Sequence, residues 1–555
     1  MSWLPVVDRE LRVGARRQST HWFRFAVAAA LVAFGFLVLA SASSSFPAHR
    51  VGRILFLWEA SILLGVCLFS GVFLTADCLS QERREGTLGL LFLAQLKSYD
   101  VVLGKLASSS LQTVFAVLAA MPILGLPLLM GGTTGGEFAR LLLVLLSTVL
   151  WSLALGMAVS AWGNDSRSTF VLTLSSVVLL GCVPPVLALF VSWSGGSHVL
   201  TGLLRAISPV GALILTQDGY YGSRQGGLYW VAVAILNGMS LGLLLFAALK
   251  LRTGLTEPTQ QASPERGSTL WRRLRYRHGS GRRRGLLEFN PFYWLASRDR
   301  LGSLLTRSSM LILGGVWACF FVAAAGPSTR SRRDNFLAVS FLICYGLHAV
   351  FKLLAAQEAT RRLHQDKQSG ALELLVVTPL PVRNILHGQW LAFRGQLTPV
   401  VTALLLTNVA LCWLITFVNP VNMNPRDRTM FCSIFIGGAV LLVLDFIALG
   451  WVGMNEGLRR RRHHWATLST FALVMAPTAA GVVVVLLLGL SGGIRSQDTI
   501  HGLIMLWLVG SGAYAVVLAQ RTRWQVAQRF RRMVAGIGPV ANPAGAPLAV
   551  GNRGA

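Results

Sequence analysis

The sequence predicts an all-α polytopic membrane protein of about twelve transmembrane helices, arranged as two tandem six-helix halves. The chain is 54% hydrophobic and only 13% charged, whereas soluble domains carry roughly 25% charged residues. Its long apolar runs must be helical, because a bilayer offers no water to unpaired backbone groups. The pattern of residues 81–105 also returns, without a gap, in residues 365–389. A chain built twice explains both the length and the repeat.

The first predicted half covers residues 1–250 and opens on an amphipathic head, residues 5–24. Leu4, Val7 and Leu11 follow helical spacing there, and charged residues occupy the other faces, which is typical of a helix lying on the membrane surface. A short apolar piece, residues 207–215, is introduced by Ser-Pro and is too short to cross, so we expect a helix that dips back into the interface. The six spans are expected at 23–45, 54–79, 106–130, 138–162, 169–193 and 228–250.

The second half, residues 289–522, restarts the pattern after a basic cytoplasmic linker at residues 251–288. Its Asn290-Pro291 start resembles the head of the first half, and residues 523–555 are expected to form a basic, disordered tail. The spans of this half are expected at 304–326, 336–357, 390–418, 430–454, 466–490 and 501–520.

The arginine distribution predicts the topology. Both copies of the repeated motif, the linker and the tail fall inside when the N-terminus is inside, and only a cluster at residues 330–333 opposes this. Each half then has an even number of spans, so both termini are cytoplasmic and the halves are parallel. The formal charge of +28 is explained by these flanks and by anionic lipid, so nucleic acid is not an expected partner.

Little catalytic or metal chemistry is visible in the sequence. The seven cysteines form no CxxC pair and read as buried hydrophobes, and no Walker pattern precedes Lys105. Glu59 and Asp445 fall within predicted spans, where ionisable residues are candidates for a translocation path; a hydrogen bond between helices is the alternative. Asp77 and Glu358 lie nearer the inner interface, where solvation would explain them.

The repeated motif combines a charged helical start, a glycine and a leucine-rich run, and it lies between spans two and three of each half. This pattern predicts a short amphipathic element along the membrane, whose charged end meets a soluble partner while its leucines pack on the spans. The first copy carries Glu82, Arg83, Gly86, Thr87, Leu88, Leu90, Leu91, Gly104 and Lys105. The second carries Gly370, Leu372, Glu373, Leu374, Leu375, Thr378, Pro379, Leu380, Ile385 and Gly388.

This motif resembles that of the ABC-2-type permease family, the membrane subunits of ABC exporters, and the six-span layout is similar over nearly the whole chain. The resemblance departs at Gly89, at residues 94–97, at Ala371 and at Gln389. It implies a permease of the cytoplasmic (inner) membrane that is not itself an enzyme and exports an unidentified substrate. It also implies that two copies of a partner ATPase dock at coupling helices 81–88 and 365–372. ATP and magnesium would bind to that partner, and this chain would bind no cofactor or metal.

The resemblance assigns ATPase coupling to ten residues of the two motif copies. Two other functions stay open: a twelve-span secondary transporter, which should show more paired intramembrane charges, and a non-transport membrane scaffold with a permease-like fold. The coupling residues are Glu82, Arg83, Arg84, Glu85, Gly86, Thr87, Asp366, Lys367, Gly370 and Glu373.

Overall fold

All regular structure in the described part of the computed structural model is helical. The described residues are 12, 18–41, 47–93, 97–163, 165–193, 196–222, 226–256, 290–296, 307–308, 310–312, 314–315, 330–418, 425–460, 462–490 and 497–534. Nine helices within them are long and apolar enough to cross a membrane, or ten if one bent pair counts as a span. This confirms a multi-pass, all-α membrane protein.

The first half contains six long helices and several short ones. The long helices are α2 (Gln18–Ser41), α3 (Ala48–Leu74), α6 (Ser98–Leu124), α8 (Gly135–Trp162), α9 (Ser166–Trp193) and α13 (Gly226–Thr256). The short helices are α4 (Cys78–Arg84), α5 (Thr87–Leu93), α7 (Leu126–Leu129), α10 (His198–Ala206), α11 (Pro209–Leu215) and α12 (Asp218–Tyr221). Each long helix lies over one of the six spans predicted for this half.

From its second predicted span onward, the second half repeats the order of the long helices. Its helices are α16 (Pro291–Ala296), α18 (Arg330–Gln368), α19 (Ala371–Val377), α20 (Val382–Trp413), the π-helical turn η1 (Leu414–Val418), α21 (Pro425–Arg459), α22 (His463–Leu490) and α23 (Gln497–Val534). Asn290 begins α16 as expected, because its side-chain oxygen accepts a hydrogen bond from Tyr293 N at 3.0 Å. The predicted span 304–326 lies largely outside the described residues, as do most of the head, 5–24, and of the linker, 251–288.

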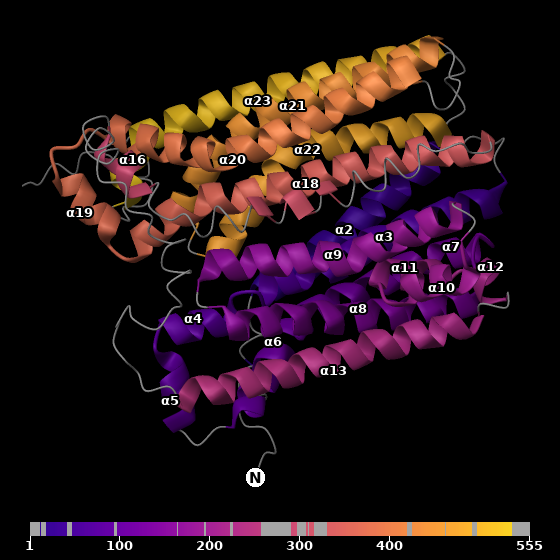
Figure 1. The fold of residues 1–555 in the computed structure, drawn as a ribbon, viewed down its shortest axis with the longest axis horizontal. Helices are drawn as coiled ribbons and strands as arrows, with labels where there is room; N and C mark the ends of the chain where they lie inside the picture. The colour runs from indigo at the N-terminus through magenta and orange to yellow at the C-terminus, as the bar shows by residue number, and fades with distance from the viewer. Residues whose placement is uncertain are drawn as a thin grey trace, which may run out of the picture.

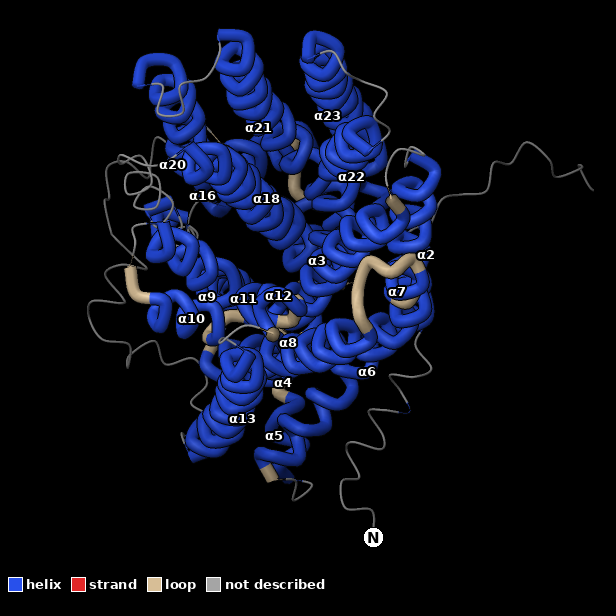
Figure 2. Tube along the Cα trace, turned by 90° about the vertical axis from the view of Figure 1, so that its right-hand side faces the viewer, coloured by secondary structure: helices blue, strands red, loops and turns tan. Residues whose placement is uncertain are grey.

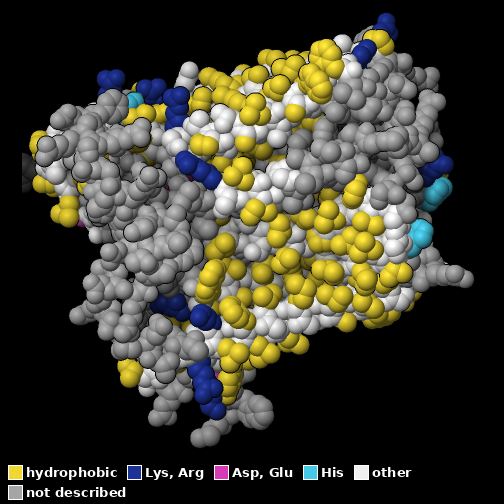
Figure 3. Space-filling view, viewed as in Figure 1, with side chains coloured by type: hydrophobic (Ala, Val, Ile, Leu, Met, Phe, Trp, Pro, Cys, Tyr) yellow, Lys and Arg dark blue, Asp and Glu magenta, His cyan; other side chains and the backbone are white. Residues whose placement is uncertain are grey.

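The two halves run in the same direction through the molecule. Helices α4 and α5 of the first half and α16 and α19 of the second lie at one end of the bundle, whereas α7, α10, α11 and α12 lie at the other (Figure 1). Hydrophobic side chains cover the middle of the face in Figure 3, and most Lys and Arg of this face lie toward the end that carries α4, α5 and α19. This charge asymmetry agrees with an inside position for that end.

Close packing of the second and fourth helices is repeated in both halves. A Cβ added to Gly156 of α8 would lie 2.1 Å from Thr75 Oγ1, and one added to Gly453 of α21 would lie 2.4 Å from Ala359 Cβ. Thr75 and Ala359 occupy matching positions in the register that aligns Gly86 with Gly370. Small residues at such crossings let membrane helices approach closely, so the internal repeat extends beyond the motif.

The apolar piece at 207–215 forms a helix, as predicted. Helices α10 and α11 are bent by 116°, the geometry of a broken span or a re-entrant loop. Ser208 caps α11 by accepting from Gly211 N at 3.1 Å, and its hydroxyl donates to Gly181 O of α9 at 2.6 Å. The bend therefore stays attached to the fifth helix of its half.

The predicted tail begins too early. Residues 523–534 continue α23 as a helix, in which Val526, Phe530 and Val534 are buried. They pack in a hydrophobic cluster with Leu372 of α19, so burial of an apolar stripe offsets the charge of the intervening arginines. Residues 535–555 lie outside the described part.

Candidate functional site

Both motif copies fold into the same local structure. In each copy a helix ends at a left-handed glycine, Gly86 with φ +73° and Gly370 with φ +74°. A seven-residue helix follows, α5 in the first copy and α19 in the second. A glycine suits this position because other residues rarely adopt such a backbone conformation.

The third position of the motif makes the same contact in both halves. Arg83 donates to the carbonyl oxygen of Ala161 at 3.0 Å, and Lys367 donates to that of Leu458 at 2.8 Å. Both acceptors precede the last residue of the fourth helix in their half, α8 and α21. A cation at a helix C-terminus satisfies an orphan carbonyl and stabilises the helix dipole. These two predicted coupling residues therefore fix the motif to the bundle.

Glu82 closes the first copy. It accepts from Lys105 Nζ at 2.7 Å and from the hydroxyl of Thr87, so one carboxylate joins the end of α4 to the starts of α5 and α6. Asp366 is the matching residue in the second copy, and Arg362 Nε lies 4.0 Å from its carboxylate. Burial raises the pKa of Asp366, while Arg362 and Arg361 oppose that change.

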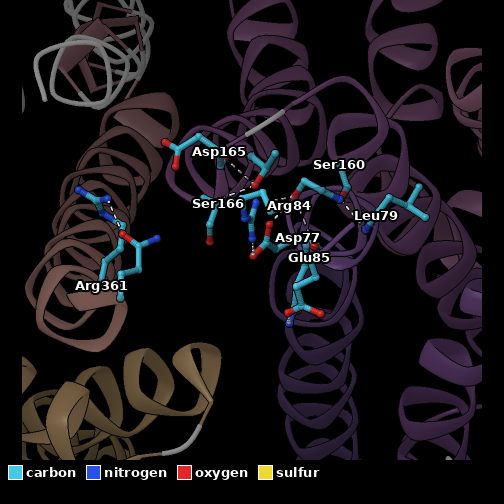
Figure 4. A network of polar contacts seen from close by, with 12 residues as sticks. Asp77, Leu79, Arg84, Glu85, Ser160, Asp165, Ser166 and Arg361 are labelled. Carbon is cyan, nitrogen blue, oxygen red and sulfur yellow. Dashed lines mark hydrogen bonds and ion pairs between the residues drawn. The ribbon is translucent and has the colours of Figure 1, made fainter. Parts of the chain in front are cut away.

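A polar network attaches α4 to α8 (Figure 4). The backbone nitrogens of Leu79 and Ser80 both donate to Ser160 Oγ at 3.0 Å. Arg84 donates to Asp77 Oδ2 at 2.8 Å. Asp77 was expected to be solvated and Arg84 to contact a partner, but the two side chains pair with each other. Glu85 is exposed and accepts from Gln81 Nε2 at 2.7 Å.

The short helices bury one face and expose the other. Leu372 is fully buried, as predicted for the motif leucines, but Leu93 and Val377 are 80% and 86% exposed. These two residues are aligned in the repeat and end α5 and α19. Leu374 and Glu373 are also exposed on α19, so the prediction that the leucines pack back holds for one face only.

Glu59 and Asp445, the candidates for a translocation path, lie in different halves and have different surroundings. Glu59 is fully buried in α3, and neither of its carboxylate oxygens has a hydrogen-bond partner in the described part of the chain. A Cβ on Gly35 of α2 would lie 3.1 Å from it. Asp445 of α21 pairs with Lys352 of α18 at 2.6 Å. Asp445 thus has an ion partner within its own half.

A cavity of about 820 Å³ lies between the two halves. Its walls come mainly from α3 and α9 of the first half and from α18 and α22 of the second, which meet near the centre of the bundle in Figure 2. Neither Glu59 nor Asp445 lines it. Sequence reasoning missed this cavity because its residues, such as Phe69, Val183 and Leu347, have the same character as lipid-facing ones.

A buried ion pair joins the halves beside the cavity. Arg167 of α9 lies 2.9 Å from Glu358 of α18, with side chains 0% and 8% exposed. Arg361 also approaches Glu358, at 3.4 Å, and Arg167 donates to Gln396 Oε1 at 3.2 Å. We expected Glu358 to be solvated at the inner interface, but it is buried in an ion pair. Only its position near the inner end of a span pointed to it.

No group of three or more His, Cys, Asp or Glu residues that would hold a metal occurs among the described residues. No protein-family model matches the chain, and no curated protein matches it. The geometry of the motif and of the cavity therefore carries the functional argument.

Proposed function

We propose that the chain is the transmembrane permease subunit of an ABC exporter. It would cross the cytoplasmic membrane twelve times as two fused, parallel six-helix halves, with both termini in the cytoplasm. ATP hydrolysis on separate ATPase subunits would drive export, and the docking elements would be α4–α5 and the end of α18 with α19. The transported substrate is unidentified, and the membrane lipid is the other partner.

The repeated docking element is the single observation that carries this proposal. Both copies have the left-handed glycine, the cation bound to the end of the fourth helix, and a protruding apolar residue, Leu93 or Val377. Internal bonds hold each element rigid, while the protruding end stays available. An exposed apolar tip in the same element as an exposed carboxylate, Glu85 or Glu373, suits a protein groove, because such interfaces combine an apolar anchor with a polar rim.

The cavity supports the transport part of the proposal. It lies between halves that a partner could move relative to one another, and small movements at one end would open or close it. The motif ends of both halves lie on the same side (Figure 1), so two ATPase subunits approaching from that side would contact both.

The test uses any Walker-type ATPase whose gene is found to neighbour that of this chain, co-expressed and purified with it. We expect Leu93→Glu combined with Val377→Glu to reduce ATPase retention and substrate-stimulated ATP hydrolysis, because a charge cannot be buried unpaired in a groove. Leu129→Glu is the matched control, since Leu129 is 84% exposed near the opposite end. Equal retention in all three proteins, or no associated ATPase at all, would contradict the proposal.

A twelve-span secondary transporter is the second candidate. The buried Lys352–Asp445 pair favours it, because such transporters use intramembrane charges to carry ions or protons. Transport by this chain alone in sealed vesicles, driven by a proton gradient and abolished by Asp445→Asn, would support it. ATP-dependent transport that survives Asp445→Asn would support the exporter.

A further inference from the structure

The walls of the cavity between the halves are almost entirely apolar. Among the described residues, no Asp, Glu, Lys or Arg lines it, and its polar members there are Ser70, Gln112 and His464. The Ser70 hydroxyl already donates to Cys67 O at 2.7 Å. A charged molecule placed inside would lose its hydration without gaining a counter-ion, at a large cost. A hydrocarbon would instead gain from leaving water.

The cavity is also long. On α18 its lining runs from Ile343 to Leu353, which corresponds to about 15 Å at 1.5 Å per residue. On α9 it runs from Val178 to Leu189, a similar length. Each extent is about half of the roughly 30 Å hydrocarbon thickness of a bilayer, the length of one leaflet's acyl chains, and Val210 and Ile214 of α11 continue the lining toward the end opposite the motif. His464 and Phe23 line the cavity near the motif end of α22 and α2.

The cavity has two sides where the halves face each other, one between α9 and α18 and one between α3 and α22. We call these sides seams, and they differ at matching positions. The α9–α18 seam is closed by the buried Arg167–Glu358 pair. Counted from the first residues of α9 and α22, Arg167 matches His464. In the register that aligns Gly86 with Gly370, Glu358 matches Leu74. His464 and Leu74 both line the cavity, and a leucine cannot form an ion pair. The α3–α22 seam, where α2 also packs on α22, therefore lacks an ion pair at these two matching positions, whereas the Arg167–Glu358 pair forms a latch across the other seam.

We infer that the cavity binds the hydrocarbon chains of a lipid from the cytoplasmic leaflet, and that the lipid enters between α3 and α22. Its headgroup stays at the level of His464 and Phe23, because the interior offers no counter-ion. The argument for lipid binding rests on the apolar walls of the cavity, and the argument for lipid entry rests on the difference between the two seams. Only a subsequent export of the lipid rests on the proposed function.

Two glycines allow a direct test of occupancy. Gly65 of α3 and Gly346 of α18 line the cavity, and an added Cβ at either meets nothing within 4 Å. Leucine at these positions narrows the cavity from a Cβ that meets no neighbour, and it favours the helix over glycine. Gly242 of α13 also has nothing within 4 Å, but it lies outside the cavity. Gly242→Leu is therefore the matched control.

The full chain is reconstituted in vesicles of phospholipid that include a phospholipid with a photoreactive diazirine in its acyl chain. After illumination, labelled peptides are identified by mass spectrometry. We expect labels on cavity residues of α3 and α22, loss of most of that labelling in Gly65→Leu combined with Gly346→Leu, and no change in Gly242→Leu. Labelling confined to lipid-facing helices such as α13, or cavity labelling unchanged by the filled variant, would overturn the inference.

The entry route is tested by copying the latch. Leu74→Glu combined with His464→Arg places the charges of Glu358 and Arg167 at the α3–α22 seam, and we expect it to reduce cavity labelling. Leu74→Gln with His464→Gln is the polar control without a charge pair and should retain labelling. Undiminished labelling with the copied latch would overturn entry between α3 and α22. Thermal unfolding of each variant shows whether it is folded.

The outcomes separate this inference from the proposed function. Cavity labelling that responds to the glycine variants, in a protein that binds no ATPase, supports the lipid site and contradicts the exporter. An ATPase that binds and is stimulated, together with no labelling of the cavity, supports the exporter and contradicts the lipid site.

Discussion

Single residues in the motif show how much of its charge is structural. Arg83 and Lys367 bind helix ends, and Glu82 joins Lys105 to Thr87. Charge alone therefore does not identify a docking residue, and replacing these groups would disturb the fold as well as any partner contact. The exposed Glu85, Leu93 and Val377 are better probes, since their side chains protrude.

The left-handed glycines give the first prediction at this scale. Nothing lies within 4 Å of a Cβ added to Gly86 or Gly370, so a substitution is limited by the backbone alone. We expect Gly370→Val to lower the free energy of unfolding by about 1–2 kcal/mol, whereas Gly370→Asn should cost less because Asn tolerates this conformation. Denaturant unfolding in detergent measures both; equal losses would mean that φ is not the cause.

The histidines at the start of α22 give a pH prediction. Burial lowers the pKa of His463 to about 3, with His364, Arg361 and His464 acting in the same direction. The ring packs against His364 at 5.6 Å between centroids, and burial also lowers the pKa of His364, opposed by the hydrogen bond to Gly457 O, with Lys367 lowering it further.

Both rings are therefore neutral in the folded protein, while the unfolded chain takes up protons near pH 6.5. Stability should be fully present above that pH and fall as the pH drops from about 6.5 towards 3. Thermal unfolding at pH 7.5 and pH 5 tests this, and His463→Phe should reduce the difference. An equal pH dependence in His463→Phe would assign it to other groups.

At the scale of elements, the sequence predicted the long apolar helices and the short helix α11 because their signals are local. It did not predict the end of α23. There the apolar stripe of Val526, Phe530 and Val534 lies within an arginine-rich run, and only its burial against the second motif reveals it. The cavity and the Arg167–Glu358 pair join residues far apart in the chain, so no local pattern could show them.

The extension of α23 gives an element-scale prediction. Phe530 is fully buried in the cluster that includes Leu372 of α19, so Phe530→Ala should cost about 3–5 kcal/mol and loosen α19. Trp524 on the same helix is 61% exposed, and Trp524→Ala should change stability little. Hydrogen exchange of α19 distinguishes the two; similar protection in both variants would show that α23 does not support α19.

At the scale of the whole molecule, the two halves share their helix order and direction but not their interface. One seam contains a buried ion pair and the other an apolar wall. Fusion of two halves in one chain permits this difference, because each position can then vary independently. The difference means that the two seams need not open with equal ease, whereas two identical seams would open with equal ease.

The latched seam yields the last prediction. Removing one member of a buried ion pair leaves an uncompensated charge, so Glu358→Gln or Arg167→Met should each cost about 3–5 kcal/mol. Arg167→Met combined with Glu358→Gln removes both charges of the pair, leaves Arg361 with its hydrogen bond to Gln365, and should cost less than the sum of the single changes. Thermal or denaturant unfolding of the wild type, the two single variants and the double variant completes this double-mutant cycle. Additive losses would mean that the pair does not hold the halves together, and the difference between the seams would then not determine which one opens.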